Sequence, residues 1–227
     1  MQLVHLLHVL PAGLLVWPAV DAIARWLRLL SSDRQAASGL PVGRPLVVIP
    51  SRAEGLRMKP LCEDVLREGV VPVVILDGDD PAARAVLTAL GARVLVKEPA
   101  GPTKGAALAW ATEALGAQTD AASHVLVFDA DMRLPEGYFE ALSVPEGAAV
   151  FQGPVRPSGV PAAGAARVEA LSTAVATLAD DLARSSRGLP VRLRGKAMGF
   201  VPHAWRAGPG AGAVTTAEDS EFTFRLL

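Results

Sequence analysis

Short apolar runs alternate with amphipathic stretches between residues 45 and 152. The apolar runs are rich in branched residues and bounded by turn residues, as in buried strands, whereas the stretches between them have helical patterning. Strands are expected at 45–50, 71–76, 93–97, 124–128 and 148–152, and helices at about 56–68, 81–90 and 104–115. This order predicts an α/β fold in which helices cover a mostly parallel, twisted sheet.

Polar side chains follow the predicted strands or open the predicted helices, where parallel sheets bind their ligands. They are Ser51, Arg52 and Glu54 after the first strand, Asp77 after the second, Lys104 and Gly105 at a helix start, Asp129 and Asp131 after residues 124–128, and Glu218 and Asp219 at the start of a last helix. Taken singly, each has an ordinary explanation as a cap, a turn or a solvated charge. Because all of them lie at corresponding ends, one shared site explains them better.

Asp129 and Asp131 are the candidate metal ligands. Residues i and i+2 of an extended chain point the same way, so both carboxylates can reach one hard cation. Mg²⁺ or Mn²⁺ held in this manner keeps positions open for phosphate oxygens. Lys104 and the free amides of its helix start could meet a phosphate. The alternative for the two aspartates is an Asx turn.

Composition narrows the function classes. The chain has 22 basic and 23 acidic residues, and this net charge of -1 argues against a nucleic-acid partner. A single cysteine, Cys62, excludes an internal disulfide and suits a reducing compartment. The hydrophobic share of 51% and a mean hydropathy of +0.33 provide for a sizeable core.

Residues 1–30 predict membrane association. Residues 3–20 carry no formal charge and have the length of a membrane-spanning helix, and 21–30 resemble an amphipathic surface helix. Arg25, Arg28 and Arg34 then favour a cytoplasmic location for the rest of the chain. A buried or partner-docked helix is the alternative. We expect a linker at 31–45 and one domain at 46–227, with a long helix at 166–186.

A family resemblance joins these motifs. In order, VVIPSRAE (47–54), VILDGDD (74–80), KGAALAWA (104–111), VFDADMRLP (127–135), GKAMGF (195–200) and TAEDSEFTFRLL (216–227) resemble the inverting family 2 glycosyltransferases, which have the GT-A fold. The resemblance covers about residue 45 to the last residue. It is strongest to the membrane-associated branch that includes cellulose, hyaluronan and chitin-oligosaccharide synthases, which implies polysaccharide biosynthesis.

The resemblance implies a role for each motif. Residues 50–52 and 54 would line the uracil and ribose pocket of a UDP-sugar together with Asp77, and Lys104 and Gly105 would lie beside the nucleotide. Asp129 would contact the donor and the metal, and Asp131 the metal. Asp219 would be the general base for an acceptor hydroxyl, supported by Glu218, with residues 195–200 along the acceptor channel. The donor would carry a hexose or an N-acetylhexosamine, and the acceptor would be a glycan, a lipid or a small molecule.

The sequence departs from the family pattern at several positions. Leu76 precedes Asp77 where two aspartates are usual, Ala53 stands where asparagine is common, and Lys196 replaces a small or neutral residue. Processive relatives continue past the helix of Asp219 with a Gln-x-x-Arg-Trp motif and membrane helices. Processive synthesis by this chain alone is therefore not expected. Two alternatives stay open: a sugar-phosphate nucleotidyltransferase, and a non-catalytic membrane-bound scaffold of a glycan-synthesis complex.

Overall fold

The computed structural model describes residues 39–153, 155, 164, 168, 172–173, 181–185, 187–208, 219 and 222–223. The chain divides into two compact units, one of residues 1–36 and 159–190, the other of residues 37–158 and 191–227. The first unit contributes one described helix, α8 (Leu182–Ser185). The predicted segment 1–30 and most of the predicted helix 166–186 lie outside the described residues. Within the described part, no helix has the length and apolar character needed to cross a membrane.

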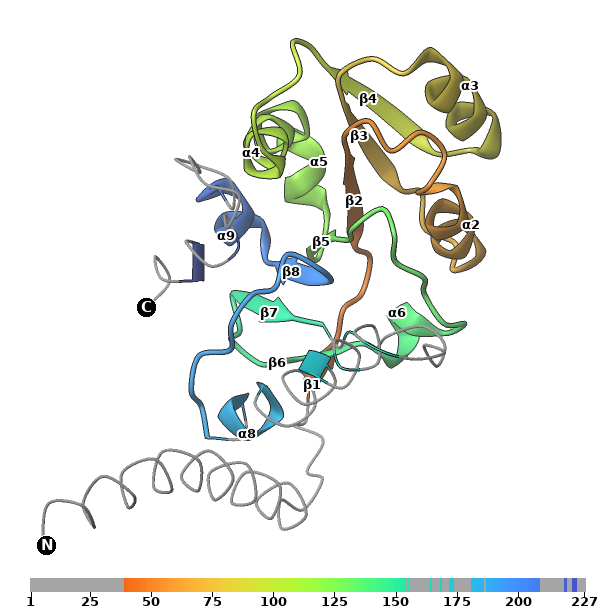
Figure 1. The fold of residues 1–227 in the computed structure, drawn as a ribbon. Coiled ribbons are helices and arrows are strands. Elements are labelled where there is room, and N and C mark those ends of the chain that lie inside the picture. The colour runs from red at the N-terminus through yellow and green to blue at the C-terminus, as the bar shows by residue number, and fades with distance from the viewer. Residues whose placement is uncertain are drawn as a thin grey trace, which may run out of the picture. The chain divides into compact units, whose positions relative to one another are not determined.

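The second unit is built on a six-stranded sheet with the strand order β4-β3-β2-β5-β8-β7 (Figure 1). Its strands are β2 (Leu46–Ser51), β3 (Val73–Asp77), β4 (Arg93–Lys97), β5 (Val125–Val127), β7 (Val150–Gln152) and β8 (Met198–Phe200). Strands β4, β3, β2 and β5 run parallel, and β8 is antiparallel to both of its neighbours. The predicted α/β class with a mostly parallel sheet is confirmed.

The central strands β2 and β3 are apolar except at their carboxyl ends, because both faces of the sheet are covered. All five residues of β3 are buried, and the first four form a continuous apolar run, as is usual in parallel sheets. Successive residues of β2 enter different cores: Val47 and Ile49 pack in one buried cluster and Val48 in the other. This alternation follows from the two-residue period of a strand.

Helices cover the two faces of this sheet, as Figure 1 shows. Helices α2 (Lys59–Arg67) and α3 (Pro81–Leu90) lie on one face, and α4 (Lys104–Ala114), α5 (Gly116–Ala121) and α9 (Pro202–Arg206) lie on the other. The Asp80 side chain caps α3 by accepting from Ala83 N, and the helix ends at Gly91 with φ of 103°. Helix α2 begins at Lys59, later than predicted, because a hydrogen-bonded turn occupies residues 54–58.

Strand β8 was not predicted from the sequence pattern. It lies within residues 195–200, which the resemblance assigns to an acceptor channel. Gly199 faces Phe151 of β7, and a β-carbon on Gly199 would stand 2.1 Å from the Phe151 ring. Glycine therefore lets the ring cross this strand. It also removes the side chain that would have marked the strand in the sequence.

Two short strands form a separate pair. Strand β1 (Gly39–Pro41) is antiparallel to β6 (Ser143–Pro145), and the four-residue helix α6 (Tyr138–Ala141) precedes β6. Strand β1 overlaps the stretch 31–45 that was expected to be a linker, of which residues 31–38 lie outside the described residues. Val42, directly after β1, is fully buried.

Helix α2 holds the segment that follows β5 through a buried carboxylate. Asp64 is 1% exposed and accepts from Arg133 Nε at 2.6 Å, Arg133 Nη2 at 2.9 Å and Leu134 N at 3.0 Å. Arg67 pairs with the same carboxylate from within α2. Burial raises the pKa of Asp64, but these hydrogen bonds outweigh it and lower the pKa to about 2.

Asp64 should therefore make the unfolding free energy of the protein depend on pH in the acidic range. Its folded-state pKa lies below the unfolded value, so the folded state binds fewer protons and its stabilisation is present above the unfolded pKa. We expect the difference in unfolding free energy between the native protein and Asp64→Asn to be constant near neutral pH. It should shrink as the pH falls from about 4 towards about 2, in urea denaturation followed by circular dichroism. A difference that stays constant across this window would contradict the role of Asp64.

Candidate functional site

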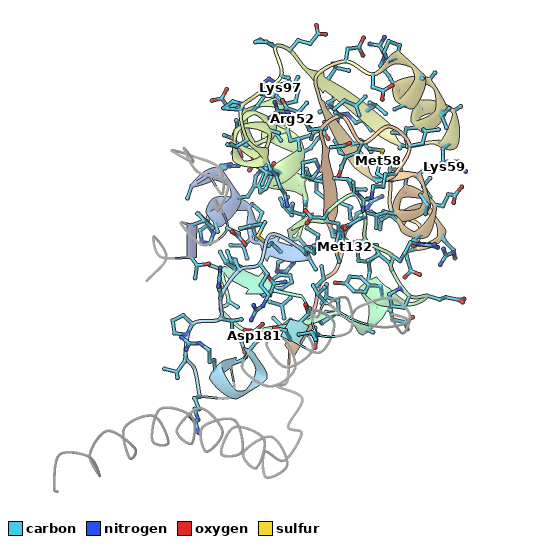
Figure 2. The ribbon with its side chains drawn as sticks, viewed as in Figure 1. Arg52, Met58, Lys59, Lys97, Met132 and Asp181 are labelled. Atoms are coloured by element: carbon cyan, nitrogen blue, oxygen red, sulfur yellow. The ribbon has the colours of Figure 1, made fainter. Side chains whose placement is uncertain are left out.

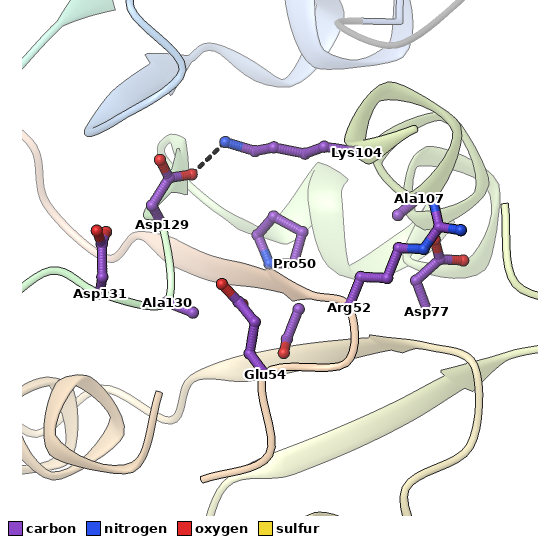
Figure 3. A pocket seen from close by; sticks show the side chains of 10 residues that line it. Pro50, Arg52, Glu54, Asp77, Lys104, Ala107, Asp129, Ala130 and Asp131 are labelled. Atoms are coloured by element: carbon purple, nitrogen blue, oxygen red, sulfur yellow. Dashed lines mark hydrogen bonds and ion pairs between the residues drawn. The ribbon is translucent and has the colours of Figure 1, made fainter. Parts of the chain in front are cut away.

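A pocket opens at the carboxyl ends of β2, β3 and β5, where the sequence placed the site (Figure 3). Its volume is about 300 Å³. The lining residues are Pro50, Ser51, Arg52, Glu54, Asp77, Lys104, Ala107, Asp129, Ala130 and Asp131. Every residue predicted for donor or metal binding is among them except Gly105, which is buried in the first turn of α4. Residues from three strand ends and one helix start therefore share one cavity.

Asp77 presents a buried, unused acceptor at this pocket. The side chain is 4% exposed, and its Oδ1 accepts from Lys97 Nζ at 3.0 Å and from Gly101 N at 2.7 Å. Among the described residues, its Oδ2 has no hydrogen-bond partner. A buried carboxylate oxygen left in this state is costly unless a ligand donates to it. The arrangement can therefore hold an N–H group of a ligand.

Lys97 supports Asp77 and was missed from the sequence. It ends β4 and also donates to Pro99 O at 2.8 Å, so it joins the ends of two strands to the loop before α4. Arg52 holds the same loop from the other side by donating to Pro102 O at 2.8 Å. Figure 2 shows both side chains at this end of the sheet. One sequence feature could have indicated this role: Lys97 ends a predicted strand, and Asp77 ends the neighbouring strand β3.

The turn after β2 contains a residue in the left-handed region. Ala53 has φ of 52°, which costs a residue with a β-carbon about 1 kcal/mol or more. Asparagine, common here in the resembling family, enters this region more readily. The turn keeps its shape without it and brings Arg52 and Glu54 to the pocket.

Lys104 and Asp129 form an ion pair across the pocket (Figure 3). Thr103 caps α4 by accepting from Ala106 N, and Lys104 is the first residue of the helix. Lys104 Nζ also donates to Gly195 O at 2.6 Å. Asp129, just beyond β5, thus has its charge balanced by the lysine that the family resemblance would place beside a nucleotide.

Asp131 lies close to two further basic side chains. Lys196 Nζ is 3.4 Å and Arg57 Nη2 is 3.9 Å from Asp131 Oδ2. Each of these three side chains is at least about a third exposed, so the pairs are weak and easily exchanged. Arg57 was not predicted as part of the site, and Lys196 was noted only as a departure from the family pattern.

The carboxylates of Asp129 and Asp131 fit a divalent metal whose remaining ligands would come from a substrate and water. No cluster of three or more histidine, cysteine or acidic residues suited to a metal occurs among the described residues. Two aspartates at one pocket, with phosphate oxygens and water as the other ligands, are a usual arrangement for Mg²⁺ and similar ions. The chemistry of these oxygen donors therefore fits Mg²⁺ or Mn²⁺.

Asp219 lies near the same loop that contacts Lys104. A β-carbon placed on Gly195 would be 3.6 Å from both Asp219 Oδ2 and Lys104 Nζ. Thr223 Oγ1 donates to Asp219 O at 2.8 Å and accepts from Leu193 N at 3.0 Å, which joins Asp219 to this loop. The structure thus brings Asp219 to the side of Lys104. Glu218, its expected supporting residue, lies outside the described residues.

Gln152 of β7 holds the loop of residues 193–197, and no sequence motif predicts this role. Gln152 Oε1 accepts from Arg194 N at 2.9 Å, and its Nε2 donates to Lys196 O at 2.5 Å. One side chain thus fixes the backbone on both sides of Gly195. The two hydrogen bonds join residues that are separated by 42 and by 44 positions in the sequence, so no local pattern predicts them.

Comparison with known proteins identifies the fold. No family model and no curated protein matches the sequence. The structure is similar to that of a mannosyltransferase from Pyrobaculum calidifontis in complex with GDP-Man and Mn²⁺, with a TM-score of 0.61 at 15% identity. The match covers 94% of this chain and 60% of the mannosyltransferase chain. A 4-diphosphocytidyl-2C-methyl-D-erythritol synthase gives a TM-score of 0.44 at 18% identity, with 81% and 84% of the two chains covered. The likeness to the mannosyltransferase shows that the chain has a GT-A-like fold.

Proposed function

We propose that this protein is an inverting glycosyltransferase that moves a sugar from a nucleotide-diphospho-sugar, a UDP-sugar, to an acceptor hydroxyl. The observation that carries the proposal is the single pocket at which the ends of β2, β3 and β5 meet the start of α4. The fold shared with a mannosyltransferase supports it. The residues that line the pocket would recognise the base and balance the charge of the diphosphate. Asp219, beside Gly195, is the candidate general base.

The nucleotide base would bind at Asp77. Its Oδ1 is already occupied by Lys97 and Gly101, and its buried Oδ2 is free to accept one N–H of the base. Uracil offers one such donor at N3. Lys97, which is 12% exposed, holds the carboxylate in place.

The diphosphate would bind between Lys104 and the two aspartates. A bound Mg²⁺ or Mn²⁺ would be held by Asp129 and Asp131 and would stabilise the negative charge of the departing nucleoside diphosphate. Lys104 would exchange part of its contact with Asp129 for a phosphate oxygen, since its ammonium already lies at the pocket. Asp219 would take the proton of the acceptor hydroxyl. One base and no carboxylate nucleophile give inversion at the sugar carbon.

The test is calorimetric binding of UDP to the full chain, with and without Mn²⁺. We expect metal-dependent binding that weakens about tenfold or more in Asp77→Ala, because that variant leaves the base N–H without its acceptor. Asp120→Asn is the matched control, because Asp120 is an exposed residue of α5 paired with Arg206. GDP, CTP and GTP are measured beside UDP.

Each outcome decides between functions. Failure of all four nucleotides to bind, with or without metal, would refute the proposal and favour a non-catalytic scaffold. Preference for CTP or GTP over the diphosphates would favour a nucleotidyltransferase. Preference for GDP over UDP would retain a glycosyltransferase and correct the donor. Membrane association of residues 1–30, with the catalytic domain on the cytoplasmic side, stays a prediction.

A further inference from the structure

The segment that follows β5 carries Asp131 and has no regular structure of its own before α6. Within it, a turn joins Met132 N to Asp129 O at 3.1 Å. Met132 packs against the core on the face of the sheet that α2 covers, and Figure 2 labels it there. The position of the Asp131 carboxylate therefore depends on what holds the residues directly after it.

Helix α2 holds those residues at two points. The first is the fork of Arg133 on Asp64, with the Leu134 amide on the same carboxylate. The second is Glu68, whose Oε1 accepts from Gly137 N at 2.9 Å. The contact at Asp64 is the stronger of the two, because this carboxylate is buried and accepts from two nitrogens of the arginine.

We propose that Arg133 is a positioning residue for the metal-binding aspartates. Held by Asp64, it fixes the backbone two residues after Asp131, so that Asp129 and Asp131 face the same ligand. A turn free to move would let the two carboxylates separate and bind the metal singly. The inference rests on the proposed function, because it concerns the metal–nucleotide complex at that pocket.

Arg67 provides a matched control for Arg133. Both arginines pair with Asp64, and their side chains are 46% and 59% exposed, so truncation of either leaves the core intact. Arg67 belongs to α2 itself, three residues after Asp64, whereas Arg133 belongs to the segment after β5. The variants Arg133→Ala and Arg67→Ala remove the same charge from the same carboxylate, but only the first removes the arginine fork that joins α2 to the segment.

The experiment measures UDP and GDP binding in the presence of Mn²⁺, together with amide hydrogen exchange of the metal-free chain. We expect Arg133→Ala to weaken nucleotide binding by about tenfold, the lower end of what the loss of a residue supporting metal ligands causes, and Arg67→Ala to change it by less than about twofold. Exchange should rise at residues 131–137 in Arg133→Ala and stay unchanged there in Arg67→Ala. Arg133→Lys keeps the charge without the fork and should restore binding only in part.

Equal binding losses in the two alanine variants would overturn the inference, because they would reflect general destabilisation. Unchanged binding and unchanged exchange in Arg133→Ala would overturn it too. If the native chain binds neither nucleotide, the proposed function fails. Hydrogen exchange then shows separately whether Arg133 holds residues 131–137, and equal exchange in both variants would refute that as well.

Discussion

Replacement of Asp219 by asparagine is expected to lower kcat by about a thousandfold, since a positioned general base contributes about 10²–10⁴ to the rate. An amide has nearly the same size but does not accept the acceptor proton. The carboxylate lies beside Gly195, which also contacts Lys104, so the base would approach the sugar from the loop side of the pocket. Release of UDP from a UDP-sugar measures the loss once a donor is known.

Nucleotide binding should distinguish this effect from damage to the fold. Asp219→Asn is expected to bind UDP and Mn²⁺ within about twofold of the native chain, since a group that acts only in the transition state does not alter ground-state affinity. Asp120→Asn serves again as the control, with kcat unchanged. A kcat for Asp219→Asn within about threefold of the native value would assign the base elsewhere.

Replacement of Asp131 by asparagine should have the next largest effect, on metal-dependent binding. We expect Mn²⁺-dependent UDP affinity to fall by about a hundredfold, which corresponds to about 3 kcal/mol. The physical reason is that Asp131 is one of the two proposed anionic oxygen ligands of the metal. Among the described residues, no group of three or more histidine, cysteine or acidic side chains could replace it. Titration calorimetry with UDP at fixed Mn²⁺ measures the change.

Metal-free nucleotide binding supplies the internal comparison for Asp131. Affinity for UDP without Mn²⁺ should stay the same or rise in Asp131→Asn, because the variant removes a negative charge and frees Lys196 and Arg57 for phosphate. An equal fall with and without Mn²⁺ would show that Asp131 acts through the fold of its segment and not as a metal ligand.

The parallel part of the sheet was predictable because its central strands, β2, β3 and β5, are buried almost throughout. Residues 71–76 and 93–97 were predicted as strands from short apolar runs between turn residues, and β3 (Val73–Asp77) and β4 (Arg93–Lys97) form there. The same pattern placed Asp77, Asp129 and Lys104 at strand ends or a helix start. The rule that such ends meet then predicted one pocket, and the structure has a pocket there.

The supporting contacts could not be predicted, because they join residues far apart in the sequence. Lys97 reaches Asp77 across 20 residues, and Arg133 reaches Asp64 across 69. In the sequence, Asp64 is one of several charges on an amphipathic helix and gives no sign that it is buried. Strand β8 was not predicted for a different reason. It has only three residues, and its central glycine contributes no side chain to an apolar pattern.

The ion pairs of the free pocket have a consequence for the order in which ligands bind. Lys104 with Asp129, and Lys196 with Asp131, neutralise each other in advance. A metal ion arriving alone has to displace a lysine from a carboxylate, and a diphosphate arriving alone has to draw a lysine away from one. With both bound, Asp129 and Asp131 would hold the metal, and Lys104 and Lys196 would be released to contact phosphate oxygens. Metal and donor would therefore bind cooperatively, each raising the affinity for the other by the same factor.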